Sequence, residues 1–202
     1  MSIKKNTEKL RNFITAFAKL LELTSQETEI LSQGRILLLD LLKTDDWLAD
    51  DFAKPHPEHY SQYLLHADSL ERFSVVSFVW GPGQQTPIHN HTVWGLVGVL
   101  RGAELSQSYI RNELGLLQLS GNEVRLENGE VESVSPNIGD IHRVKNAFAN
   151  QSSISIHVYG GNIGAVKRSV YNDDGSEKVF ISGYSNQFLP NIWDRSNEIL
   201  SL

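Results

Sequence analysis

The chain has 202 residues, 40% of them hydrophobic and 21% charged, and its formal net charge is −6. These values predict one soluble globular domain, 1–202, and the acidic balance argues against nucleic-acid binding, which needs a clustered basic face. The absence of cysteine excludes disulfides, thiolate metal sites, iron–sulfur clusters and a cysteine nucleophile. Because the sequence shows neither a signal peptide nor an apolar run long enough to span a bilayer, we expect a cytoplasmic protein without membrane attachment.

The N-terminal part, residues 1–55, is predicted to be helical. Apolar residues recur at the i, i+3, i+4, i+7 spacing over residues 7–23, which predicts an amphipathic helix there. A short third helix is predicted to open at Asp45 and to end before Pro55.

A second helix is predicted to follow the first directly. Thr24-Ser-Gln-Glu27 is typical of a capping box, in which Thr24 and Glu27 satisfy the first free amides of a helix. Gly34 is a weak point inside this helix, because glycine loses more conformational entropy than other residues. The apolar residues of the helix are Ile30, Leu31, Ile36, Leu37 and Leu41.

From residue 60 onward, β-branched and aromatic segments alternate with turn signals such as Asn128-Gly129. Many short strands with polar turns predict a mainly β fold, a barrel or sandwich within residues 60–185, with the helices as an annex. The predicted strands are residues 73–80, 93–100, 104–110, 114–119, 131–135, 142–145, 153–159 and 178–181.

Three histidines form a candidate metal site. His89 and His91 lie two residues apart in a segment framed by Gly83 and Gly102, and residues at this spacing project from the same face of a strand. His142 lies in a second segment with its own turn. Three neutral nitrogen donors with no obvious carboxylate partner predict a mononuclear metal site with open coordination positions.

The segment Ser155-Ile-His157-Val-Tyr159 forms a second constellation. Strand alternation places Ser155, His157 and Tyr159 on one face, where a hydroxyl, an imidazole and a phenol in line can share protons. Such a pattern is also typical of the ordinary polar outer face of a strand. The other three histidines favour a functional role, with His157 orienting the Tyr159 hydroxyl.

The first histidine segment resembles the first motif of the cupin superfamily, G(x)5HxH(x)3–4E(x)6G. The matching residues are Gly83, His89, His91 and Gly102. Gly95 stands where most metal cupins have a ligating glutamate. Losing that carboxylate leaves the positive charge of the metal uncompensated, which favours anionic partners such as a thiolate.

The second histidine segment resembles the second cupin motif, G(x)5PxG(x)2H(x)3N. The matching residues are Gly129, Pro136, Gly139, His142 and Asn146, with one extra residue before and one after the proline. The two resemblances together imply a cupin barrel, a double-stranded β-helix of jelly-roll type.

A three-histidine cupin with an S-x-H-x-Y segment resembles the thiol dioxygenases, iron enzymes that add both atoms of O2 to a substrate sulfur. The resemblance covers residues 60–168. It implies Fe(II) as the cofactor, bound by His89, His91 and His142. It also implies an outer-sphere triad of Ser155, His157 and Tyr159.

Two positions distinguish this chain from the animal cysteine dioxygenases. Those enzymes have a carboxylate-binding arginine where Gln62 stands here, and a cysteine crosslinked to the triad tyrosine where Gly95 stands. The chain is more similar to the bacterial 3-mercaptopropionate dioxygenases, in which an arginine beyond a glycine-rich loop binds the substrate carboxylate. Arg168 matches that arginine, although Lys167-Arg168 is also typical of a solvated basic pair. Gln62 is a candidate for bonding the substrate or the triad.

We therefore expect a non-haem Fe(II) dioxygenase that converts a small thiol carboxylate, preferably 3-mercaptopropionate, to its sulfinate with O2. L-cysteine is the alternative substrate. A zinc or nickel cupin acting as a hydrolase or isomerase, and a non-catalytic cupin binding module, are the alternatives from other classes. The sequence leaves the oligomeric state open.

Overall fold

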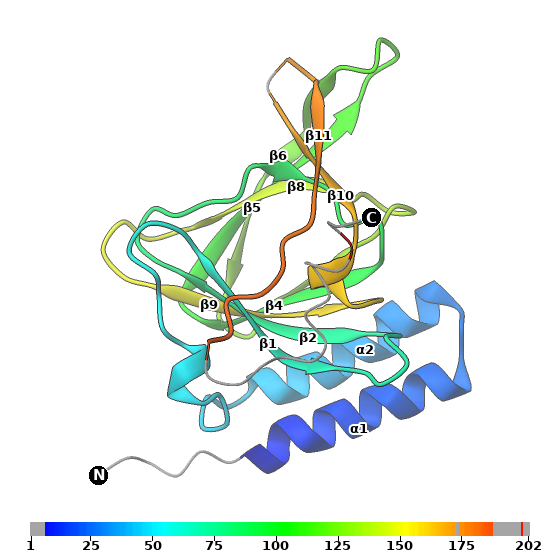
Figure 1. Ribbon diagram of the computed structural model, residues 1–202, viewed down its shortest axis with the longest axis vertical. Coiled ribbons are helices and arrows are strands. Elements are labelled where there is room, and N and C mark those ends of the chain that lie inside the picture. Colours follow the sequence, from blue (N-terminus) through cyan, green and yellow to red (C-terminus); the bar gives the residue numbers. More distant parts are fainter. Residues whose placement is uncertain (1–6, 173, 188–198, 200–202) are drawn as a thin grey trace.

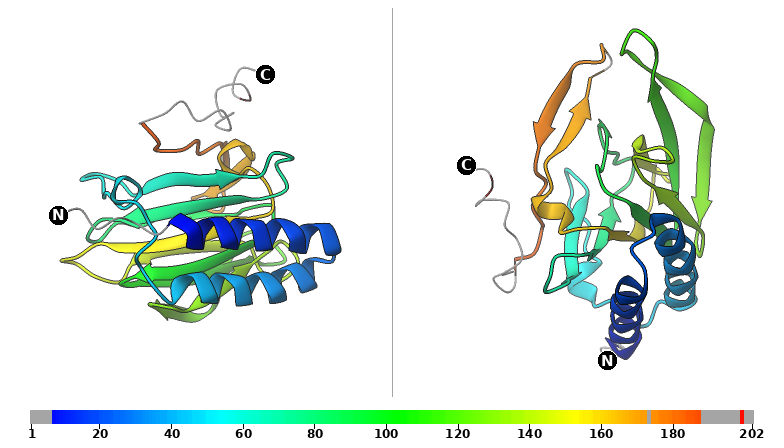
Figure 2. Two further views of the ribbon diagram at one scale, coloured as in Figure 1. Left: turned by 90° about the horizontal axis from the view of Figure 1, so that it is seen from below. Right: turned by 90° about the vertical axis from the view of Figure 1, so that its right-hand side faces the viewer.

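Two antiparallel sheets face each other in this computed structural model, and two helices lie along the outside of one of them (Figure 1, Figure 2). The structure describes residues 7–172, 174–187 and 199. The predicted mainly β fold with a helical N-terminal annex is confirmed. Within the described residues, no helix is both long enough and apolar enough to cross a membrane.

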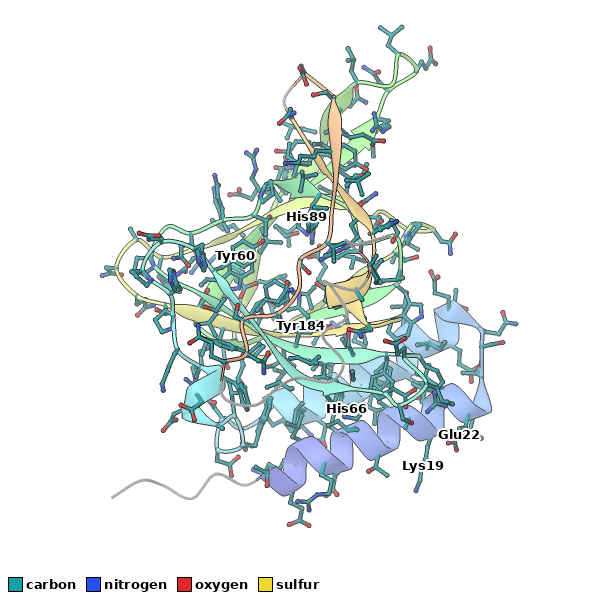
Figure 3. All side chains as sticks on the ribbon, in the orientation of Figure 1. Lys19, Glu22, Tyr60, His66, His89 and Tyr184 are labelled. Atoms are coloured by element: carbon teal, nitrogen blue, oxygen red, sulfur yellow. The ribbon has the colours of Figure 1, made fainter. Side chains whose placement is uncertain are left out.

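Helix α1 (Thr7–Leu23) has the predicted bounds and buries Phe13 and Phe17. Its charged face, with Lys19 and Glu22, points to solvent (Figure 3). The apolar stripe therefore acts as predicted, by attaching the helix to the molecule through one side.

The predicted capping box at the start of α2 (Glu27–Leu42) is wrong. Gln26 is the N-cap residue and makes no side-chain cap. Thr24 Oγ1 accepts a hydrogen bond from the Gln26 amide at 3.1 Å. The Glu27 carboxylate instead accepts hydrogen bonds from Ser135 Oγ and from Asn137 Nδ2. Glu27 therefore ties the helix start to a barrel loop, a partner that the local sequence does not reveal.

Two further predictions about the helical annex also differ from the structure. Ile36, predicted on the apolar face of α2, is 58% exposed. Gly34 is also a contact point: a Cβ atom there would lie 2.8 Å from Phe17 Cε2, so glycine lets the two helices approach. The third helix is a single 3-10 turn, Asp50–Phe52, which begins later than predicted.

The first sheet has five strands in the order β1-β2-β9-β4-β7. Their bounds are β1 Ser61–Ala67, β2 Ser74–Trp80, β9 Ser153–Tyr159, β4 Gly95–Arg101 and β7 Val131–Val134. Its outer face packs on the helices in one apolar core that includes Phe17, Leu38, Leu96 and Ile156. The other face looks into the barrel.

The second sheet has six strands in the order β11-β10-β3-β8-β5-β6. Their bounds are β11 Glu177–Phe180, β10 Arg168–Tyr171, β3 Ile88–His89, β8 Ile141–Asn146, β5 Ala103–Arg111 and β6 Leu117–Glu127. The β5–β6 and β10–β11 hairpins project beyond the barrel (Figure 2). Strands β1, β3 and β10 were not predicted, and β6 begins three residues later and ends eight residues later than predicted.

Candidate metal centre and its cavity

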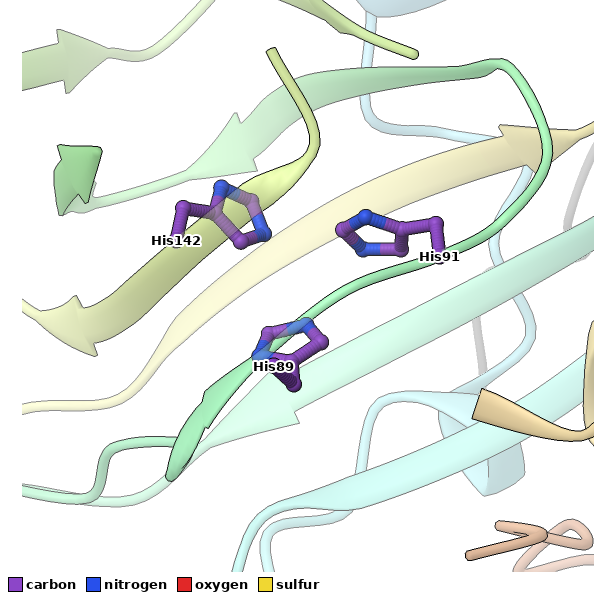
Figure 4. A group of neighbouring side chains, drawn as sticks. All are labelled: His89, His91 and His142. Atoms are coloured by element: carbon purple, nitrogen blue, oxygen red, sulfur yellow. The ribbon is translucent and has the colours of Figure 1, made fainter. Parts of the chain in front are cut away.

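The three predicted metal-binding histidines converge inside the barrel (Figure 4). His89 ends β3 and lies opposite His142 of β8 in the strand register, while His91 follows two residues after β3. All three side chains are buried. One ring nitrogen from each lies within 4.8 Å of the others. This spacing lets one ion contact all three.

In each histidine the Nδ1 atom has an oxygen partner, so Nε2 is left to face the shared centre. The partners are the Pro87 carbonyl at 3.1 Å for His89, Asp140 Oδ1 at 3.0 Å for His91 and Ser106 Oγ at 3.4 Å for His142. A carbonyl and a carboxylate can only accept, so His89 and His91 carry their proton on Nδ1 and present a lone pair on Nε2.

Burial makes these imidazoles neutral. It holds the pKa of His89 well below its ordinary value, lowers the pKa of His91, and lowers the pKa of His142 to about 3. Asp140 keeps its charge: burial alone would raise its pKa, but hydrogen bonds from His91 and from the Thr92 amide lower it overall. The donor set is therefore three neutral nitrogens, which fits a divalent transition metal with further coordination positions open.

Gly95 leaves room for Tyr159. A Cβ atom at this position would lie 2.8 Å from Tyr159 Cδ1, so the phenol ring occupies the space that a longer side chain would need. The Tyr159 ring also stacks on the His91 ring, with 5.3 Å between centroids. The glutamate of the common cupin motif is thus replaced by an aromatic wall beside the three histidines.

Ser155, His157 and Tyr159 lie on the inner face of β9 and form one hydrogen-bonded chain. Ser155 Oγ lies 2.7 Å from His157 Nε2, and His157 Nδ1 lies 2.7 Å from Tyr159 Oη. All three side chains are buried, so this strand face is not a solvent face. The Phe78 ring stacks on His157 at 4.1 Å between centroids, and Trp80 Nε1 donates to Ser155 Oγ at 3.2 Å.

Burial also sets the protonation of this chain. It holds the pKa of His157 well below its ordinary value, and it raises the pKa of the Tyr159 phenol. Both groups are therefore neutral at physiological pH, which leaves the Tyr159 hydroxyl able to donate a hydrogen bond.

A cavity of about 190 Å³ lies beside the histidines. The three histidines, His157, Tyr159, Arg168 and Gln62 all line it, and Ser155 lies behind His157. Arg168 and the exposed Lys178 are the cationic residues of the lining, and the lining contains no carboxylate among the described residues. The cavity therefore favours a small anion.

Arg168 is buried at the start of β10 and is not part of a solvated basic pair. Its Nη2 atom donates to Ser182 Oγ at 2.7 Å, and the guanidinium lies over the Phe180 ring. Its Nε atom has no hydrogen-bond partner in the part of the chain that the structure describes. A buried guanidinium with a free N–H donor next to a cavity can bind a carboxylate through two hydrogen bonds.

Gln62 is buried on β1 and lies near Arg168 through a shared partner. Its Nε2 atom donates to Ser182 Oγ at 2.7 Å and also to the Gly183 carbonyl. The amide therefore holds the segment around Ser182 beside the guanidinium, and both side chains belong to one wall of the cavity.

A sequence model described as Cysteine dioxygenase type I matches residues 2–169, well over half of the chain. The chain belongs to this family. The family implies a thiol dioxygenase, an oxidoreductase that acts on a small molecule with O2, in agreement with the three-histidine site.

The solved structures that resemble this member of the cysteine dioxygenase type I family do so at low sequence identity. A protein from Klebsiella pneumoniae with a double-stranded β-helix domain is 18% identical, with a TM-score of 0.46 over 60% of this chain and 89% of that chain. A protein from Thermus thermophilus is 18% identical, with a TM-score of 0.44 over 55% and 92%. An RmlC-like cupin from Desulfovibrio desulfuricans is 19% identical, with a TM-score of 0.42 over 58% and 95%.

Some residues of the site were not predicted. Asp140 was missed, although its position two residues before His142 was a signal that it lies near the centre. Tyr60 and Ser182 also line the cavity, and no site role was predicted for either.

Proposed function

We propose that this chain is a non-haem Fe(II) dioxygenase that oxidises a small thiol carboxylate, with 3-mercaptopropionate as the preferred substrate, to its sulfinate. Family membership supports the reaction class. The observation that carries the substrate class is Arg168, a buried guanidinium that lines the cavity and has no salt-bridge partner among the described residues.

In the overall reaction, a thiol R–SH and O2 give the sulfinic acid R–SO2H. The O–O bond breaks, two S–O bonds form, and both oxygen atoms stay in the product. Sulfur loses four electrons and O2 gains four, so no external reductant is needed. Fe(II) held by His89, His91 and His142 supplies the redox chemistry for this exchange when it is bound.

Arg168 binds the substrate carboxylate through two parallel hydrogen bonds, which fixes the orientation of the substrate as well as its position. Its own contact with Ser182 Oγ limits the rotation of the guanidinium. Gln62 holds the same hydroxyl from the other side. The distance from this wall to the three histidines then selects the number of carbons between carboxylate and sulfur.

Tyr159 donates a hydrogen bond from its hydroxyl to the sulfur or oxygen atoms that react beside the histidines. His157 holds the phenol oxygen at 2.7 Å, so the hydroxyl is in place before the substrate arrives. The raised pKa of Tyr159 keeps its proton available. Phe78 and Trp80 line the cavity and exclude water from the reacting atoms.

The preference for 3-mercaptopropionate over L-cysteine follows from the charges around the cavity. L-cysteine carries an ammonium group in addition to its thiol and carboxylate. Among the described residues, no aspartate or glutamate lines the cavity to pair with that ammonium, whereas Arg168 and Lys178 would repel it. A substrate without an amine avoids this cost.

The test is oxygen uptake by metal-free protein that has been loaded anaerobically with Fe(II). We expect the highest kcat/KM with 3-mercaptopropionate, a lower value with L-cysteine and the lowest with cysteamine, which has no carboxylate. Protein loaded with Zn(II) is the control and should consume no O2. No thiol-dependent uptake would overturn the proposed function, and faster oxidation of L-cysteine would overturn the proposed substrate.

A further inference from the structure

Glu104 is a buried acid behind the triad. It lies on β5, it is 0% exposed, and its strand partners are Asn146 of β8 and Leu126 of β6. Neither carboxyl oxygen makes a hydrogen bond of ordinary geometry among the described residues. Such an acid costs free energy, because burial removes the solvation of its charge, and its presence therefore calls for an explanation.

Besides burial, the groups that act on the Glu104 carboxyl are the side chains of Ser155 and Trp80 and, among charged groups, Glu132 of β7. Burial raises the pKa of Glu104 to about 8, and the negative charge of Glu132 acts in the same direction, although Ser155 and Trp80 oppose the shift. At neutral pH the side chain is therefore a neutral carboxylic acid. In that form it can donate a hydrogen bond.

The hydrogen-bonded chain of the triad can run in two directions, because a neutral imidazole carries one N–H. If His157 is protonated on Nδ1, it donates to Tyr159, and the Tyr159 proton is free for the cavity. If His157 is protonated on Nε2, it donates to Ser155, and Tyr159 must donate back to His157 Nδ1. Only the first direction gives a phenol that donates to substrate.

Ser155 decides between these directions. Its oxygen already accepts a hydrogen bond from Trp80 Nε1 at 3.2 Å. If a neutral Glu104 donates a hydrogen bond to the second lone pair of Ser155 Oγ, the Ser155 hydroxyl must donate to His157 Nε2. His157 is then protonated on Nδ1. If Glu104 is ionised, its carboxylate accepts a hydrogen bond from the Ser155 hydroxyl instead. Every hydrogen bond of the triad then reverses its direction.

We propose that Glu104 is a positioning residue whose carboxylic acid proton, donated to Ser155, directs the triad so that Tyr159 donates into the cavity. Its relevance to catalysis rests on the proposed function. The direction of the hydrogen bonds is a property of the protein alone and is present without metal or substrate.

The experiment is nitrogen NMR of metal-free protein labelled with 15N-histidine, in which the shifts of the two ring nitrogens report the tautomer. The His157 signals are assigned by their loss in His157→Asn. Below the pKa of Glu104 we expect His157 protonated on Nδ1, and above it the form protonated on Nε2. Glu104→Gln, whose amide donates at every pH, should keep the Nδ1 form throughout. A wild-type chain with the Nε2 form below this pKa, or the same pH response in Glu104→Gln, would overturn the proposal.

Kinetics with Fe(II)-loaded protein give a second readout. Glu104→Met has a similar volume but no donor, and we expect its kcat to fall about tenfold while KM is unchanged, as for loss of an orienting partner. Glu104→Gln should keep kcat within about twofold and lose the decline at alkaline pH. Equal losses of kcat in both variants would count against the proposal. If no thiol is oxidised while the His157 tautomer responds as described, the proposed function fails, but the role of Glu104 in directing the hydrogen bonds of the triad stands.

Discussion

Two buried regions lie back to back on strand β9, and they differ in what their burial achieves. Ile154, Ile156 and Val158 face the helices and join the apolar core. Their neighbours in sequence, Ser155, His157 and Tyr159, face the barrel interior and form hydrogen bonds with one another. Every residue of the strand is buried. Burial alone therefore does not distinguish a stabilising side chain from a functional one.

The two faces differ in what burial of their side chains contributes to the free energy of unfolding. Apolar burial against α1 and α2 contributes to stability, at about 25 cal/mol for each Å² removed from water. Burial of an imidazole or a carboxyl group costs free energy that hydrogen bonds only offset. Substitutions on the helix side should therefore lower stability and leave the chemistry unchanged. Substitutions on the barrel side should change the chemistry and have little effect on stability.

The largest expected effect comes from the barrel side. His91→Ala removes one of three nitrogen donors, and we expect metal affinity and thiol oxidation each to fall by at least about 100-fold. Metal content after dialysis and oxygen uptake measure the two losses. His56→Ala is the matched control, because this histidine stacks on His59 away from the centre and should change neither. Retention of stoichiometric metal by His91→Ala would contradict the site.

Arg168→Met tests another part of the lining of the same cavity. Loss of a charge-assisted bidentate contact is worth about 1.5 to 3 kcal/mol, so KM for 3-mercaptopropionate should rise roughly 10- to 150-fold. KM for cysteamine should stay the same, because it has no carboxylate. Arg168→Lys, which keeps the charge without the fork, should give an intermediate value. Equal losses with both thiols would remove Arg168 from carboxylate binding.

Ile156→Ala tests the helix side. The side chain is 0% exposed, and its truncation should lower the free energy of unfolding by about 2 to 5 kcal/mol. Urea unfolding measures this change. Because Ile156 faces away from the cavity, kcat and KM at a temperature where the variant stays folded should match those of the wild-type chain. A large change in kcat would show that the two faces of β9 are coupled.

Tyr159→Phe removes only the hydroxyl at the end of the triad. We expect kcat to fall about tenfold or more, in line with the loss of a positioned donor. The free energy of unfolding should change by no more than about 1.5 kcal/mol, the usual contribution of one hydrogen bond. Steady-state kinetics and urea unfolding of the same preparation compare the two effects. Unchanged kcat would contradict the role given to Tyr159.

The pH dependence of stability gives a further contrast. Between the ordinary pKa of 4.5 and the raised value of about 8, the folded chain keeps a proton on Glu104 that the unfolded chain has lost. The stability of metal-free protein should therefore decrease as pH rises through this interval. Relative to Glu104→Gln, the loss should be about 1.4 kcal/mol for each pH unit. Parallel curves for the two proteins would show that Glu104 ionises normally.

Where the sequence carried periodic information, it predicted the structure well. Strict alternation from Ser153 to Tyr159 gave both faces of β9, and the helical spacing gave the bounds of α1. The spacing of His89, His91 and His142 predicted a cluster before any strand pairing was known. Each of these patterns depends on local geometry that the chain follows on its own.

Features that depend on contacts between distant segments could not be predicted in the same way. The carboxylate of Glu27 has the spacing of a cap, but its partners lie in a loop more than a hundred residues away. Glu104 has the appearance of a solvent-facing residue in an alternating strand, and only the closure of the barrel buries it. Strand β3 is two residues long, too short for any periodic signal.

The most direct test of the central claim is the mass of the product formed under 18O2. Fe(II)-loaded protein should convert 3-mercaptopropionate to a sulfinate in which both oxygen atoms are labelled, because O2 is the source of each. A sulfinate that carries one label or none, or the absence of any oxidised thiol, would contradict the account.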